Sequence, residues 1–261
     1  MKKLKVLSLV LVLVMALAVV ADASSLVAPV TAKAYQGFAQ TPAFRVGPGK
    51  DATDTQVYSF TVLMTNAMFD KDGRVVNVFF DALEIATPNY DGASMPHFSG
   101  WPATPGYNVS EHKEENAQVT GKSTNTDATI AAEVNGWKSK RERGDAYGMN
   151  PANDWYKQTN FYQNIFKGKT IAEIEQWVAK YTSDLNKRPL RVPTATTKPE
   201  DKAKYEKLTA AEKLVAADVV SGATMSVSDG HGDFIGAIKK AYANRIEIEI
   251  PVQVEYSVKM Q

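Results

Sequence analysis

An alternating run of apolar residues, a turn and a second β-rich run most constrain the fold of this 261-residue chain. The alternation places large apolar side chains on one face of a strand and small polar ones on the other: Tyr58, Phe60, Val62 and Met64 against Ser59, Thr61 and Thr65. Residues 70–73 end in Gly73, which suits the left-handed position of a turn, and residues 74–85 are rich in Val and Phe. We therefore predict a long β-hairpin over residues 56–85.

Amphipathic patterns predict helices in the rest of the chain. Two begin at capping boxes, Thr170 with Glu173 and Thr209 with Glu212. The predicted helices cover residues 126–137, 154–166, 170–181, 209–218 and 233–244, and further strands cover residues 34–39 and 246–250, the last ended by Pro251. The pattern predicts an α+β fold in which helices pack a small antiparallel sheet, with a long helical and loop insertion at about residues 90–207.

Several segments are predicted to have no binding role. Residues 138–145 mix basic and acidic side chains, which indicates a solvated surface. Residues 181–207 contain three prolines and are predicted to be a linker or surface crossing. Asp70 and Asp72 lack the later ligands of a calcium loop, so a plain turn is expected. Trp177 and Tyr181 follow helical spacing and are predicted to be core residues.

Composition excludes several classes of function. The chain has 30 basic and 29 acidic side chains, without the basic excess of a nucleic-acid binder. It has no cysteine, which rules out disulfides, thiolate metal sites, Cys nucleophiles and a lipid-modified Cys. His97, His112 and His231 are too scattered for a zinc site, and Asp229 and Asp233 fit a polar turn, so we expect no metal.

The N-terminus has the pattern of an export signal. Three lysines precede the apolar residues 7–20, and residues 21–23 read as an A-x-A cleavage site. The run is shorter than the roughly 20 residues that a membrane span needs. We predict a signal peptide over residues 1–23, a flexible leader over residues 24–33, and an exported protein that is periplasmic, on the cell surface or secreted, and not a lipoprotein.

The most specific motif is the segment from residue 218 to residue 226. It contains Asp218, Ser221, Gly222, Ala223, Thr224 and Ser226. A Thr hydroxyl is a weak nucleophile that a second protein must activate. The small neighbours leave its approach open, and the backbone N–H groups and serine hydroxyls are able to bind a phosphate. Asp218 is expected to serve the activating protein or to cap the backbone. The alternative is a Ser/Gly/Thr turn at a helix end, without chemistry.

This segment resembles the flavinylation motif of the FMN-binding domain family, D-x-x-S-G-A-T-x-S. In that family a flavin transferase joins the phosphate of FMN to the Thr hydroxyl, and members include flavin-carrying subunits of the sodium-translocating NADH:quinone oxidoreductase and of the related ferredoxin:NAD oxidoreductase. The resemblance implies covalent FMN on Thr224, and it places Thr87 and Pro88 near the isoalloxazine ring. It covers about half of the mature chain; the insertion and the late start of the last helix depart from the family.

The loop after Pro88 is rich in aromatic residues. Tyr90, Phe98 and Trp101 would be able to stack on a flavin, and His97 to hydrogen-bond its edge. The same aromatics would equally serve to pin a long loop to the core, and the two interpretations stay open.

Two classes of function follow from these patterns. The first is an exported flavoprotein, comprising residues 34–261 as one FMN-binding domain, that carries electrons from a membrane-bound oxidoreductase or another donor. The second is an extracytoplasmic ligand-binding module without redox activity. A hydrolase is a distant third, because the chain has no nucleophile elbow or paired His.

Overall fold

The computed structural model describes residues 30–52, 54–90, 95–103, 125–149, 152–229 and 232–252. The chain divides into two units, residues 35–247 and a unit of residues 1–34 with 248–261. The predicted signal peptide lies outside the described residues, as do His112 and His231. The fold and site described below belong to the unit of residues 35–247.

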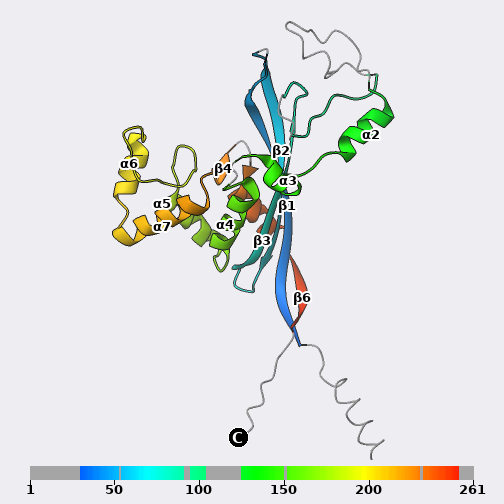
Figure 1. Cartoon of the computed structure of the whole chain (residues 1–261). Helices are drawn as coiled ribbons and strands as arrows, with labels where there is room; N and C mark the ends of the chain where they lie inside the picture. Colours follow the sequence, from blue (N-terminus) through cyan, green and yellow to red (C-terminus); the bar gives the residue numbers. More distant parts are fainter. Residues whose placement is uncertain are drawn as a thin grey trace, which may run out of the picture. The chain divides into compact units, whose positions relative to one another are not determined.

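The main sheet has four strands in the order β3-β2-β1-β6. Its strands are β1 (Val30–Lys50), β2 (Gln56–Phe69), β3 (Val75–Ala86) and β6 (Ile246–Val252) (Figure 1). β1 pairs with β2, and β2 with β3, in antiparallel ladders. A second, two-stranded sheet joins β4 (Ser228–Asp229) to β5 (Gly232–Asp233).

Seven α-helices complete the α+β fold of the described residues. They are α2 (Asp127–Asn135), α3 (Lys140–Arg143), α4 (Trp155–Phe166), α5 (Ile171–Tyr181), α6 (Pro199–Glu206), α7 (Ala210–Gly222) and α8 (Phe234–Ala243), with a short 3-10 helix over Gly144–Tyr147. Both predicted capping boxes form, and two more pair Thr126 with Thr129 at the start of α2 and Ser139 with Glu142 at the start of α3. No helix of the described part is long and apolar enough to cross a membrane.

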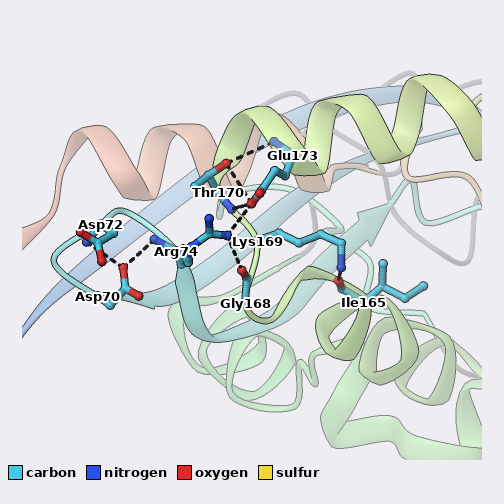
Figure 2. A network of polar contacts seen from close by, with 8 residues as sticks. All are labelled: Asp70, Asp72, Arg74, Ile165, Gly168, Lys169, Thr170 and Glu173. Carbon is cyan, nitrogen blue, oxygen red and sulfur yellow. Dashed lines mark hydrogen bonds and ion pairs between the residues drawn. The ribbon is translucent and has the colours of Figure 1, made fainter.

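The predicted hairpin is confirmed, and polar contacts attach its turn to the start of α5. Gly73 has a φ of 75°, and Asp70 accepts hydrogen bonds from the backbone of the turn, as expected of a plain turn. Figure 2 shows Arg74 donating to the carbonyl of Gly168 at 2.8 Å and to Glu173 at 2.7 Å. Glu173 also completes the cap of α5, so one carboxylate fixes the helix start and the hairpin end.

The covered face of β2 is the one that carries the small polar residues. Thr61 and Thr65 are fully buried, whereas Tyr58 and Phe60 are 42% and 46% exposed. The buried face also holds Leu63 and other apolar residues at the same alternate positions, so both faces are apolar enough to be covered. Helices α8, α4 and α3 pack on the hairpin. Its buried face is polar near the open end of the hairpin, where Ser59 and Thr61 of β2 and Glu84 of β3 are buried.

The predicted insertion supplies much of the hydrophobic core. Tyr162 and Phe166 of α4 and Ile174 of α5 are fully buried, and they pack with Phe80 of β3 and Phe234 of α8. Trp177 belongs to the same cluster, which confirms that it is a core residue. These helices are an integral part of the folded unit.

Four predictions about element boundaries are wrong. β1 extends beyond residues 34–39 on both sides: it begins at Val30, within the predicted flexible leader of residues 24–33, and its pairing with β2 continues through Pro42. The segment 181–207 contains α6, and Tyr205 and Leu190 pack in a second small core. α7 continues past Asp218 to Gly222. β6 continues through Pro251 to Val252.

The segment 138–145 is only partly a solvated surface: Lys138, Glu142 and Asp145 are exposed, but other side chains of the segment are buried or half-buried. Lys140 is 1% exposed, and Arg141 donates to the backbone carbonyl of Phe80 and to Gln163. Ser139 donates to Asp81 at 2.7 Å. Charged and polar side chains of this segment therefore contact partners in β3 and α4. Sequence patterns alone do not show such contacts.

Candidate functional site

The motif of residues 218–226 spans the end of α7 and the turn that follows. Asp218, Ser221 and Gly222 lie in the last turns of the helix, and Ala223 is its C-cap with an extended backbone. A Cβ at Gly222 would overlap the ring of Phe161, so the glycine is required for the packing of α7 against α4. The chain therefore leaves the helix at a defined position just before Thr224.

Two side chains of α4 hold the backbone on both sides of Thr224. The amide oxygen of Gln158 accepts hydrogen bonds from the N–H groups of Thr224 and Met225, at 2.8 and 2.9 Å. The hydroxyl of Tyr162, one turn further along, donates to the carbonyl of Met225 at 2.7 Å. Burial raises the pKa of Tyr162, so it remains a donor. Gln158 is itself 2% exposed and donates to the carbonyl of Asn153.

The hydroxyl of Thr224 is left uncommitted by these contacts. Thr224 is half-buried, and its side chain makes no hydrogen bond with the part of the chain that the structure describes. Hydrogen bonds from α4 thus hold the backbone at Thr224, while its hydroxyl stays unbonded within the described residues.

The other polar groups of the motif are engaged within the chain. The hydroxyl of Ser221 donates to the carbonyl of Asp218 at 2.6 Å, and that of Ser226 donates to the carbonyl of Asn186 at 2.7 Å. The N–H of Ala223 donates to Val219. These groups shape the turn here, and a phosphate on Thr224 would have to replace their present partners before it received their hydrogen bonds.

Thr87 and Pro88 lie where the hairpin ends. The N–H of Thr87 donates to the carbonyl of Tyr58, its side-chain oxygen accepts from the N–H of the same residue, and Pro88 is buried. The N–H of Tyr90 donates to the carbonyl of Thr87, which closes a turn. The loop therefore begins from a fixed position at the polar end of the sheet.

A buried charged cluster, which the sequence analysis missed, lies at this end of the sheet. Glu84 is fully buried and forms ion pairs with Lys140 at 2.8 Å and with Arg45 at 3.0 Å, and it accepts from the hydroxyl of Ser59. Burial acts to raise the pKa of Glu84, but the charge and hydrogen bond of Lys140, the hydroxyl of Ser59 and the charge of Arg45 together lower it to about 2. The one available signal was a Glu at an inward position of an alternating strand.

This pKa predicts a pH dependence of stability. Because the pKa of Glu84 falls from 4.5 to about 2 on folding, its contribution is complete above about pH 4.5 and is lost as the pH falls towards 2. We expect wild type to lose roughly 3 kcal/mol more than Glu84→Gln by pH 2, of which roughly 2 kcal/mol is already lost at pH 3. Urea unfolding at pH 7, 4 and 3 measures the difference; parallel losses in the two proteins would contradict it.

Arg143 connects the charged cluster to the start of α4. Burial lowers the pKa of Arg143, whereas the charges of Tyr147, Glu84, Tyr90 and Asp154 act to raise it, so all four groups lie within its electrostatic reach. Its guanidinium stacks on Tyr147 at 4.5 Å from the ring centroid. Tyr90, Arg143 and Tyr147 are partly buried, so each of the three residues keeps some exposed surface.

Asp154 is the fully buried N-cap residue of α4. Its Oδ1 accepts from the N–H of Trp155 at 2.6 Å, and its Oδ2 has no hydrogen-bond partner among the described residues. Gln158, which holds Thr224, lies one helical turn further along α4 and donates its N–H to the Asp154 carbonyl. The first turn of α4 thus carries both Gln158, which contacts Thr224, and Asp154, which lies within electrostatic reach of Arg143.

Trp101 belongs to a different group of aromatic residues from Tyr90 and Tyr147. It is 61% exposed and lies edge-on to Phe98 at 4.8 Å, and Phe98 contacts Trp137 at 6.4 Å. His97 faces Glu133 at 3.6 Å. Contacts of this kind fit the interpretation in which the aromatics pin the loop, here to the region of α2.

A hollow of about 850 Å³ lies between α5, α6 and α7. Trp177, Tyr181 and several lysines line it, and none of the predicted site residues does. Among the described residues, no cluster of His, Asp and Glu is able to hold a metal ion.

Comparison with known proteins finds a relative with a reductase name. A protein named chlorophenol reductase from Desulfitobacterium hafniense is 36% identical to this chain over 230 residues, which cover 85% of the chain and 62% of the relative. The chain therefore spans less than two thirds of that protein's length. No family model matches the chain, and no solved structure matches it.

Proposed function

We propose that this protein is a flavoprotein that carries FMN on Thr224 through a phosphoester and acts in electron transfer. The observation that carries the proposal is the free, half-buried hydroxyl of Thr224 on a backbone held by Gln158 and Tyr162. The surrounding residues match a flavinylation motif from Asp218 to Ser226. The reductase name of the relative supports a redox role.

Attachment needs a flavin transferase as partner. The Thr224 oxygen displaces a leaving group from an activated flavin phosphate, such as the second nucleotide of a flavin dinucleotide, and a base of the transferase takes the hydroxyl proton. No such base contacts Thr224 within the described residues, so a second protein has to supply it. The small Gly222 and Ala223 leave room for the approach.

The bound flavin would supply the one- and two-electron chemistry, and the protein its attachment and surroundings. The electron donor is proposed to be a membrane-bound oxidoreductase or another carrier, and the signal sequence would place the protein outside the cytoplasm.

The test is the mass of the intact chain after co-expression with a flavin transferase. We expect an added mass equal to one FMN less one water, yellow colour, and a modified peptide that contains Thr224. A colourless chain without an adduct would overturn the proposal and favour the ligand-binding module instead.

Gln158 provides a second prediction. Gln158→Met keeps the length of the side chain but removes the acceptor of both N–H groups, so the turn at Thr224 should loosen and flavin attachment should slow about tenfold or more under limiting transferase. Gln158→Glu keeps the acceptor of both N–H groups but loses the donor to the Asn153 carbonyl and buries a charge, so its rate should lie between those of wild type and Gln158→Met. In-gel flavin fluorescence over time measures both; equal rates for the two variants would show that the contact has no role in attachment.

A further inference from the structure

Among the described residues, the second carboxylate oxygen of Asp154 is the polar atom that most needs an explanation. Burying an acceptor without a partner costs roughly 1–3 kcal/mol, and more for a charged group. Asp154 is fully buried, and only its Oδ1 is used, to cap α4. A serine would cap the helix as well without burying a charge. The second oxygen therefore indicates a ligand that brings a donor.

We propose that Asp154 binds the ring of the flavin, accepting a hydrogen bond through Oδ2 from the N3–H of its pyrimidine edge. This inference rests on the proposed function for its ligand. It adds a binding residue that lies outside the motif of residues 218–226 and in the helical region that the sequence analysis treated as an insertion.

The position of Asp154 relative to Thr224 fits this role. Thr224 contacts Gln158 at 2.8 Å, and Asp154 lies one helical turn before Gln158, about 6 Å along α4. A ribityl phosphate has about eight bonds of about 1.5 Å, which is long enough to reach from the Thr224 hydroxyl past this turn.

The groups around Asp154 fit the remaining features of the ring. A pyrimidine edge presents a carbonyl on each side of its N–H, and the cationic Arg143, within electrostatic reach of Asp154, complements a carbonyl oxygen. Tyr90 and Tyr147 are partly exposed aromatics near the same guanidinium, and they offer flat apolar surface to a planar ring.

The experiment separates ring binding from covalent attachment. Lumiflavin, which has the ring without the ribityl phosphate, is titrated into Thr224→Val protein, and quenching of its fluorescence reports binding. Asp154→Asn is the informative variant: its Oδ1 still caps α4, which fixes the amide so that its NH₂ group faces the N3–H. Asp145→Asn is the matched control, since Asp145 is 71% exposed and pairs with Lys157.

We expect the Thr224→Val protein and its Asp145→Asn derivative to bind lumiflavin equally. The Asp154→Asn derivative should bind at least tenfold more weakly while it still unfolds in one cooperative thermal transition. In flavinylated protein, Asp154→Asn removes a negative charge beside the ring and should raise the reduction potential, by about 59 mV for a tenfold change in a one-electron equilibrium.

Lumiflavin binding that is absent, or equal in the Asp154→Asn and Asp145→Asn derivatives, would overturn the inference, as would an unchanged potential. The proposed function fails differently: a wild-type chain without an FMN adduct that still binds lumiflavin through Asp154 would refute covalent attachment and leave the ring site standing.

Discussion

Thr224→Val should abolish flavin attachment completely. The substitution preserves the branched shape of the side chain and deletes only the oxygen that forms the phosphoester. The backbone contacts of residue 224 with Gln158 do not involve this side chain, so the turn and the fold should be unchanged. Intact mass and in-gel flavin fluorescence after co-expression with a flavin transferase measure the result.

Thr224→Ser is the matched control. It keeps a hydroxyl and loses a methyl group, so it should retain partial labelling. A Thr224→Val chain that still carries FMN would move the attachment to another hydroxyl, for which Ser221 and Ser226 are the nearest candidates, although both now donate to backbone carbonyls.

Lys140→Met should destabilise the fold by about 3–5 kcal/mol, because it leaves the carboxylate of Glu84 buried with only Arg45 and Ser59 as partners. Both members of the pair are essentially inaccessible to water, so solvent does not screen the loss. Chemical unfolding at pH 7 measures the change in the free energy of unfolding.

The double variant Lys140→Met, Glu84→Gln is the control. Removing the charge together with its partner should recover more than half of the lost stability, because the penalty arises from the uncompensated carboxylate. If the double variant is as unstable as Lys140→Met, the loss comes from the contacts of the Lys140 ammonium with the rings of Tyr147 and Trp155 and not from the uncompensated carboxylate.

The parts of the fold that depend on neighbouring residues were predictable. Capping boxes at Thr170 and Thr209, and the glycine of the hairpin turn, are set by hydrogen bonds and backbone angles within four residues, which one stretch of sequence specifies. The same spacing at Ser139 and Glu142 would have identified α3.

Only part of the candidate site was predictable from neighbouring residues in the same way. The motif around Thr224 is a local pattern and can be recognised without a structure, whereas Gln158 and Asp154 have no signal beyond a place on an amphipathic helix. They lie about 70 residues before Thr224, and only the packing of α4 against α7 and β3 brings them to it.

The sequence by itself therefore determined the hairpin, the helix starts and the chemically distinctive Thr224, because each depends on short-range periodicity or hydrogen bonding. Only the tertiary structure decided which face of β2 is buried, since both faces carry apolar residues and alternation does not show which one the helices cover. The tertiary structure also decided that Lys140 and Glu84 are buried together, because a charged side chain is buried only when a partner from a distant element neutralises it.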